Sequence, residues 1–192
     1  MGRVRVDLTG FSKPVRSQEA NVVKKTLVLG LGNILLGDEG VGVRVVERLQ
    51  ELYRFPPEVQ VLDGGTLALD LLPYVEDADR LLVIDALEMG AEPGTIARLE
   101  GDKVPAFLSV KISPHQMGLA DLLAAARLRN FYPQEVVLWG VQPEAVRPGL
   151  ELSSPVAAQV EVLVDKVLAE LNRWGIAPKL RKSAKTSEVS QV

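Results

Sequence analysis

The stretch that decides the fold is "LVLGLGNILLGDEGVGVRVVERL", residues 27–49. It begins with a short apolar run, passes through a "GLG" turn, and changes at Asp38 to the spacing of an amphipathic helix. A dinucleotide-binding turn would place its third glycine at position 35, where this chain has Leu35. Asp38 and Glu39 also stand where a phosphate would need backbone N–H groups and no competing negative charge. The stretch predicts a buried strand, a tight turn and a helix, and it disfavours nucleotide binding.

The rest of the chain alternates between strand and helix signals. Strands are expected at residues 27–31, 58–65, 80–87, 95–99 and 135–141. The run "RLLVIDAL" is apolar on both faces, as central parallel strands are. Strand and helix repeat in turn, with one extra pair of strands late in the chain. This order predicts an α/β fold with a mostly parallel sheet of five strands and helices on both faces.

Helices are expected between these strands. The first starts at Asp38 as its N-cap and runs to residue 53, and a short one over residues 66–75 stops near Pro73. A third has an apolar stripe at Leu119, Leu122, Leu123 and Ala126. The last is capped by Ser153 or Ser154, has Pro155 in its first turn, and ends at Gly175.

Composition narrows the class of protein. The 192 residues are enough for one domain, which we place at residues 26–178, between an extension at 1–25 and a polar tail at 179–192 that is predicted to be disordered. A net charge of −3 gives no electrostatic reason to expect nucleic acid or a membrane as partner. The chain has no cysteine, which excludes a thiol nucleophile and suits a reducing cytoplasm. No apolar run approaches the length of a membrane span.

Acidic residues follow three of the expected strands. Asp38 and Glu39 follow the first, Asp63 follows the second, and Asp85 closes the third. Because ligands bind at the carboxyl ends of parallel strands, these side chains mark a candidate site. Each has a simpler interpretation: Glu39 as a first-turn acid that favours the helix dipole, and Asp63 as a turn residue. For Asp85 a functional role is favoured, because an unpaired charge at the end of an apolar strand is costly.

The only histidine is His115, in "KISPHQMGL", which we expect to be a proline-containing loop leading into a helix. A lone histidine is more often a structural hydrogen-bonding group than a ligand. The chain nevertheless lacks a Gly-x-Ser-x-Gly elbow, an HExxH motif and a P-loop. What remains is a possible metal site of two carboxylates and one imidazole from Glu39, Asp85 and His115. Such a set suits a borderline divalent ion such as nickel or zinc, held weakly enough that a partner could complete the site.

Four motifs in this order resemble the nickel–iron hydrogenase maturation endopeptidases: "GLGNILLGDEGVGVRVVE", "LDGGT", "VIDA" and "KISPHQMGLAD". The resemblance covers about residues 26–175. It implies a three-layer α/β/α sandwich around a twisted sheet. It also implies that Glu39, Asp85 and His115 bind metal, and we assign the catalytic site to the same three residues.

The resemblance implies an activity as well. Members of the family that this chain resembles remove a short C-terminal peptide from the hydrogenase large-subunit precursor after nickel has been inserted. The nickel would therefore arrive with the substrate, although other divalent metals could occupy the site. Asp38, Asp63, Gly64 and Gly65 are expected to line the same cleft and bind the substrate chain.

Three alternatives remain open. A nickel-binding maturation chaperone that inspects the precursor without cutting it would use the same ligands. A peptidyl-tRNA hydrolase-like enzyme can also begin with a "GLGN" turn, but it would need a histidine and an asparagine soon after that turn and would be expected to show a basic face. A nucleotide-binding module is disfavoured by Leu35 and by the acids at the helix start.

Overall fold

The computed structural model describes residues 23–110 and 114–181, with the side chains of residues 110 and 114–117 left out. Its centre is a five-stranded sheet in the order β3-β1-β4-β6-β5. The strands are β1 (Thr26–Leu31), β3 (Val59–Gly65), β4 (Arg80–Ala86), β5 (Ile96–Glu100) and β6 (Glu135–Val141). All neighbours are parallel except β5, which is antiparallel to β6. The five predicted strands and the mostly parallel sheet are confirmed.

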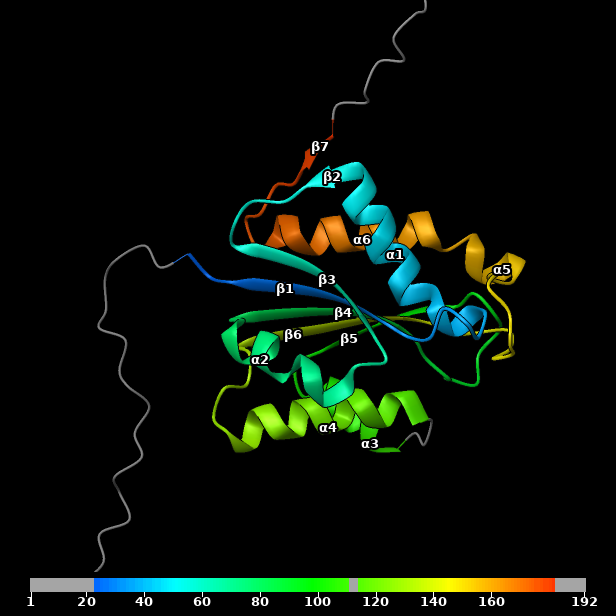
Figure 1. Ribbon diagram of the computed structural model, residues 1–192, viewed down its shortest axis with the longest axis horizontal. Helices are drawn as coiled ribbons and strands as arrows, with labels where there is room; N and C mark the ends of the chain where they lie inside the picture. The colour runs from blue at the N-terminus through cyan, green and yellow to red at the C-terminus, as the bar shows by residue number, and fades with distance from the viewer. Residues whose placement is uncertain (1–22, 111–113, 182–192) are drawn as a thin grey trace, which may run out of the picture.

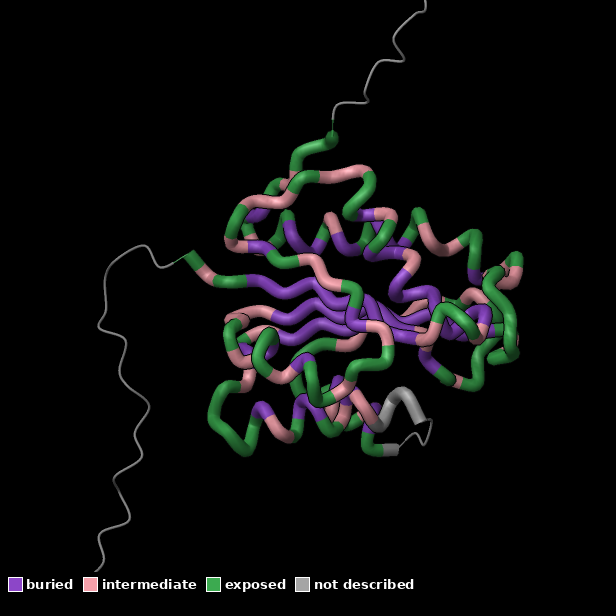
Figure 2. The backbone as a smooth tube through the Cα atoms, in the orientation of Figure 1, coloured by how far each residue is buried: buried purple, intermediate pink, exposed green. Residues whose placement is uncertain are grey.

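Helices cover both faces of this sheet and give three layers (Figure 1). One face carries α1 (Val41–Leu52), α5 (Ser154–Ala157) and α6 (Val160–Arg173), and the other carries α2 (Leu72–Asp77), α3 (Lys103–Val110) and α4 (Pro114–Leu128). Strand β4 shows why both faces are covered: Leu82 and Ile84 belong to the core under α1 and α6, whereas Leu81 and Val83 belong to the core under α4. The buried segments form the middle layer in Figure 2. The predicted three-layer sandwich is confirmed.

Helix α1 approaches the sheet closely at its first turn. A Cβ added at Gly42 would lie 2.2 Å from the carbonyl oxygen of Ile84 and 2.4 Å from that of Leu31. No side chain fits at this distance, so α1 rests directly on the backbones of β1 and β4. The short 3₁₀ helix η1 (Asp38–Gly40), which leads into α1, is therefore held over the carboxyl ends of both strands.

Several helix boundaries differ from the predictions. Pro73 lies at the start of α2 and does not stop a helix, because a first-turn residue needs no N–H. The last helix is divided into α5 and α6, since Gln159 N–H donates to Val156 O, three residues back, at 2.9 Å. Asp38 lies inside η1 and does not cap α1. The prediction of one continuous last helix and of an Asp38 cap is therefore wrong.

Other short elements were not predicted. A second sheet pairs β2 (Tyr53–Arg54) with β7 (Lys179–Leu180), so the first two residues of the expected polar tail form a strand. Residues 182–192 and 1–22 lie outside the described chain, and the domain boundaries stay a prediction. Helix α3 was also missed, and α4 begins at Pro114, so His115 belongs to a helix and not to a loop. In the part of the chain that the structure describes, no helix is long and apolar enough to cross a membrane.

Candidate active site

The sheet places its strand exits so that a site can form between β1 and β4. After β1 the chain adds β3 on one side, and then returns to place β4 on the other side of β1. Such a reversal of strand order opens a crevice at the carboxyl ends of the strands. Glu39 follows β1, and Asp85 is the penultimate residue of β4. The two acids therefore meet at this crevice.

Backbone contacts fix the position of Glu39. Its side chain is buried, with 7% exposed, and it lies in the 3₁₀ turn between β1 and α1. Gly32 has a φ of +119°, and a Cβ there would lie 1.7 Å from the carbonyl oxygen of Glu39. Only glycine at position 32 allows the backbone of the turn after β1 to pass this close to the carbonyl oxygen of Glu39. The "GLG" motif thus serves to bring an acid to the end of the strand.

Asp85 is buried beside Glu39, with 2% of its surface exposed. Its Oδ1 accepts a hydrogen bond of 2.8 Å from the N–H of Ala86. The pKa of the Asp85 carboxyl is raised to about 7, because burial and the negative charge of Glu39 raise it by more than the hydrogen bond from Ala86 lowers it. The structure therefore brings Glu39 and Asp85 close enough for their charges to interact, which supports a site that favours a bound cation.

The third proposed ligand is placed only by its backbone. His115 is the second residue of α4, and its side chain lies outside the described residues. Three residues later, Gly118 lies beside Gly32 and Gly65, so the first turns of α4 are at the same end of the sheet. Among the described side chains, no group of three or more acids or histidines is placed to hold a metal ion. Two buried carboxylates with an imidazole would fit nickel or zinc, and this ligand set stays a prediction.

Asp38 has a role that the sequence did not indicate. Its side chain is buried, with 1% exposed, and both oxygens accept hydrogen bonds from the segment after β6. Oδ2 accepts from the N–H of Glu144 and Ala145 and from the hydroxyl of Ser153, and Oδ1 accepts from the N–H of Ser153 at 2.6 Å. We therefore assign Asp38 a positioning role, joining two loops that are over 100 residues apart, and its contact with the substrate stays a prediction.

The "LDGG" motif ends β3 at the same end of the sheet. Asp63 is exposed, and its Oδ1 accepts a hydrogen bond of 2.9 Å from the N–H of Gly65, as the turn interpretation predicts. Gly64 is buried, and a Cβ there would lie 2.7 Å from Leu29 Cδ1. Gly65 has a φ of +45°, and its carbonyl accepts from the N–H of Gly32 at 3.0 Å. The exposed carboxylate of Asp63 remains available to a substrate.

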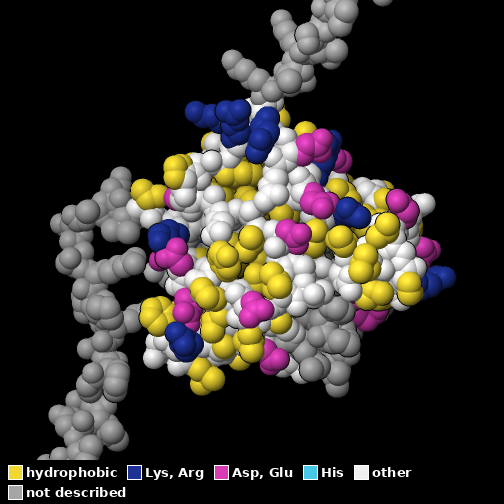
Figure 3. Space-filling model, viewed as in Figure 1, with side chains coloured by type: hydrophobic (Ala, Val, Ile, Leu, Met, Phe, Trp, Pro, Cys, Tyr) yellow, Lys and Arg dark blue, Asp and Glu magenta, His cyan; other side chains and the backbone are white. Residues whose placement is uncertain are grey.

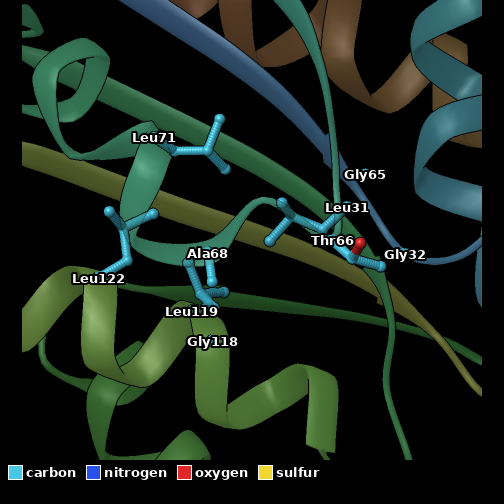
Figure 4. A pocket seen from close by; sticks show the side chains of 9 residues that line it. All are labelled: Leu31, Gly32, Gly65, Thr66, Ala68, Leu71, Gly118, Leu119 and Leu122. Atoms are coloured by element: carbon cyan, nitrogen blue, oxygen red, sulfur yellow. The ribbon is translucent and has the colours of Figure 1, made fainter.

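A small hollow of about 60 Å³ lies between these exits and α4. Figure 4 shows its lining, which includes Gly32, Gly65 and Gly118 together with apolar side chains of β1, η2 (Ala68–Leu71) and α4. Typical small-molecule pockets are roughly 300–1,000 Å³, so this one holds no more than a side chain. A larger hollow of about 480 Å³, lined in part by Thr26, lies at the opposite end of the sheet from Glu39 and Asp85.

Gln142 is a site residue that the sequence reasoning missed. It follows β6, is only 4% exposed, and its Oε1 accepts from the N–H of Met89 at 2.7 Å and of Ala91 at 3.3 Å. Its Nε2 donates to Glu88 Oε1 at 2.9 Å. Gln142 therefore holds the loop that follows Asp85. A polar residue directly after an apolar strand, the signal that identified Asp85, would also have identified Gln142.

Comparisons with known proteins agree with this architecture. The model of the family described as "Hydrogenase maturation protease" matches residues 43–170. The hydrogenase 2 maturation protease of Escherichia coli K12 is 44% identical over 153 residues, which cover 79% of this chain and 93% of the relative. The hydrogenase expression/formation protein HupD of Rhodobacter capsulatus is 43% identical over 155 residues, covering 80% of this chain and 74% of the relative.

Solved structures show the same fold. The hydrogenase maturating endopeptidase HybD from E. coli superposes with a TM-score of 0.79 at 43% identity, covering 82% of this chain and 98% of that one. The [NiFe] hydrogenase maturation protease HybD from Thermococcus kodakarensis gives a TM-score of 0.63 at 29% identity, covering 74% and 96%. These relatives decide against a nucleotide-binding module, a peptidyl-tRNA hydrolase and a non-cleaving chaperone. The chain belongs to the hydrogenase maturation protease family and is a processing endopeptidase for hydrogenase.

Proposed function

We propose that this endopeptidase removes a short C-terminal peptide from the nickel-loaded large-subunit precursor of a nickel–iron hydrogenase. In this proposal Glu39, Asp85 and His115 recognise the nickel carried by the precursor. The observation that carries it is the burial of Glu39 and Asp85 together at the carboxyl end of the sheet. A buried carboxylate beside a second negative charge, as Asp85 is beside Glu39, is stabilised by a divalent cation placed between the two.

A cation supplied by the substrate fits the chemistry of this site. Three ligands, two of them carboxylate oxygens, leave coordination positions open, and the set contains no thiolate to hold nickel tightly. The free enzyme is therefore expected to bind nickel weakly. A precursor that already carries nickel brings the missing charge, so the enzyme acts only on a substrate whose metal has been inserted.

The substrate chain is proposed to pass the end of β3. Asp63 is exposed there and can accept hydrogen bonds, and Gly65 leaves room for another backbone, because a Cβ there would have only Asp63 Oδ1 within 4 Å. Gly64 packs against the side chain of Leu29, and its proposed contribution is to the shape of this turn. The proposed partner is thus a protein and neither nucleic acid nor membrane, as the net charge of −3 also favours. We place the reaction in the cytoplasm, a compartment that suits a chain without cysteine.

The test is a paired incubation of the enzyme with nickel-loaded and nickel-free precursor, read by mass spectrometry of the large subunit. We expect loss of a C-terminal peptide from the nickel-loaded precursor alone. Equal cleavage of both precursors would refute recognition of nickel. Release of a peptide from any other position would refute C-terminal processing.

Variants of the three proposed ligands test which residues bind the metal. Glu39→Gln, Asp85→Asn and His115→Ala should each abolish or strongly reduce cleavage, while circular dichroism shows a folded chain. Glu47→Gln is the matched control, because Glu47 is an exposed acid on the adjoining helix that pairs with Arg44. Wild-type cleavage by a folded His115→Ala variant would remove His115 from the site.

A further inference from the structure

Exposed apolar side chains are concentrated around the candidate site. Among the described residues, twelve large hydrophobic side chains are exposed, and six of them lie on the three short segments that follow β1, β3 and β6. These six are Ile34, Leu35, Leu67, Leu69, Val146 and Leu150. Exposed apolar groups that gather in one place mark an interaction surface, whereas single ones are ordinary.

Four of them lie on two loops that are joined to each other. We call Ile34, Leu35, Val146 and Leu150 the apolar platform. The N–H of Gly37 donates to Gly149 O, and the N–H of Gly149 donates to Leu35 O, both at 2.9 Å. In Figure 3 hydrophobic side chains gather on the right of the molecule, where Figure 1 shows the loop after β1 beside the segment that leads to α5.

The platform is a fixed surface. Beneath it, the carboxylate of Asp38 accepts four hydrogen bonds from Glu144, Ala145 and Ser153, which tie the second loop to η1. A free loop could turn its apolar residues inward. These two loops are held by their own backbones, so Leu35 stays 59% exposed and Leu150 58% exposed. The cost of exposing them to water is recovered only when a partner covers them.

The platform is continuous with the candidate site. A Cβ added at Gly40, the residue after Glu39, would lie 2.8 Å from the Cα of Ile34, so the platform adjoins the turn that carries Glu39. Across the strand exits, Leu67 and Leu69 present a second apolar edge after β3. Exposed charges of both signs lie beside the platform, from Arg147 and Glu151, so apolar contact and not charge would select its occupant.

We propose that the apolar platform docks an apolar segment of the protein substrate next to the bond that is cut. The occupant is a stretch of the substrate's own chain, because the family acts on protein and the platform adjoins the proposed site. This inference rests on the proposed function. It adds a second requirement for cleavage: the substrate must carry apolar side chains close to the cleavage position, in addition to any nickel.

The experiment compares Leu35→Ser and Leu150→Ser with Leu128→Ser. Leu128 is 85% exposed at the far end of α4 and is the matched control. Burying a leucine on binding contributes enough that each platform variant should lower kcat/KM roughly tenfold, mainly through KM. Binding of uncleaved precursor, measured by biolayer interferometry, should weaken by a similar factor, and nickel binding by the free enzyme should not change. Leu128→Ser should match the wild type in every measurement.

The outcomes separate this proposal from the proposed function. If the wild type binds precursor but does not cleave it, while Leu35→Ser binds more weakly, the docking surface stands and the proposed activity fails. If the wild type cleaves and both platform variants cleave and bind equally well, the docking proposal is overturned. It is also overturned if light scattering shows a wild-type dimer that both variants disrupt without any effect on the precursor. Circular dichroism of each variant confirms folding, which these exposed positions should not affect.

Discussion

The candidate site has two sides that are built by different forces. We call residues 33–40 with 143–153 the loop side, and η2 with α4 the helix side. On the loop side, Asp38 and the backbone joins between the two segments provide a dense set of hydrogen bonds. On the helix side, among the described residues, no hydrogen bond joins η2 to α4, and Gly118 packs against Ala68 beside a small hollow.

The difference shows which side of the site must place its side chains precisely. The loop side carries Glu39 and faces Asp85, so the two buried acids are placed by rigid backbone contacts. The helix side carries His115 at the start of α4, and among the described residues η2 and α4 are joined to each other by packing without a hydrogen bond. Packed apolar surfaces tolerate small shifts better than a fully bonded carboxylate does. We therefore expect the loop side to respond sharply to small substitutions and the helix side to accept them.

The largest loss of stability is expected for Gly42→Ala, because Gly42 lets α1, and with it the loop side, lie close to the sheet. The new Cβ would lie 2.2 Å from Ile84 O and 2.4 Å from Leu31 O, and both are backbone atoms of central strands. Helix α1 would have to move off the sheet, at a cost of more than about 5 kcal/mol. Urea denaturation measures this loss, and a stability within 1 kcal/mol of the wild type would contradict the close approach of α1.

The second-largest loss of stability is expected for Asp38→Ala. The substitution leaves three backbone N–H groups and the Ser153 hydroxyl without their acceptor, at a combined cost of about 4 to 5 kcal/mol. Ser153→Ala removes one of these four bonds and should cost only about 1 kcal/mol. Thermal unfolding compares the two variants. Equal losses would mean that Asp38 does not hold the loop side together.

The third effect depends on pH. In metal-free enzyme, burial raises the pKa of Asp85 from 3.8 to about 7, so the folded protein binds a proton more tightly than the unfolded chain does. Its stability should therefore fall as the pH rises from about 4 to 7, by roughly 4 kcal/mol at most. Asp85→Asn removes this dependence while its amide oxygen can still accept from Ala86 N–H.

The measurement is urea denaturation of both proteins in a chelating buffer at several pH values. Asp85→Asn should be the more stable protein above pH 7, and the difference should disappear below pH 4. A constant difference across this range would show that Asp85 titrates normally. Glu47→Gln, which removes an exposed acid, serves as the control and should leave the pH profile unchanged.

The smallest effect is expected for Gly118→Ala, on the helix side. The new Cβ would lie 3.2 Å from the Cβ of Ala68, a contact that a shift of a few tenths of an ångström relieves. Alanine also favours the helix over glycine by about 1 kcal/mol. The variant should therefore stay within about 1 kcal/mol of the wild type by thermal unfolding. A loss like that of Gly42→Ala would erase the difference between the two sides.

The sequence was sufficient for most of the architecture. Apolar runs predicted the central strands β1 and β4, because a strand buried on both faces leaves a continuous signal, and alternation predicted the edge strand β3. Helix boundaries were less predictable. Pro73 starts a helix or stops one according to its place in the turn, and the break between α5 and α6 comes from a single change of hydrogen-bond partner at Gln159. The spacing of apolar residues alone does not determine where a helix begins or breaks.

The site was predictable only in part. Glu39 and Asp85 could be identified because each follows or closes a buried strand, and the structure places them together. Asp38 was expected to bind the substrate, yet its partners Glu144 and Ser153 lie more than 100 residues away, which no local pattern can reveal. The role of His115 stays a prediction, since its side chain lies outside the described residues.

The contact between Gly32 and the carbonyl of Glu39 has a consequence for the use of salt in experiments. This contact holds the acid by the shape of the main chain, and such a contact carries no net charge that ions could screen. At an ionic strength of 0.15 M, dissolved ions largely screen the interaction between exposed charges that are more than about 8 Å apart. Raising the salt concentration should therefore leave the placement of Glu39 unchanged. Any salt dependence of processing then reports on the encounter between the enzyme and its protein substrate.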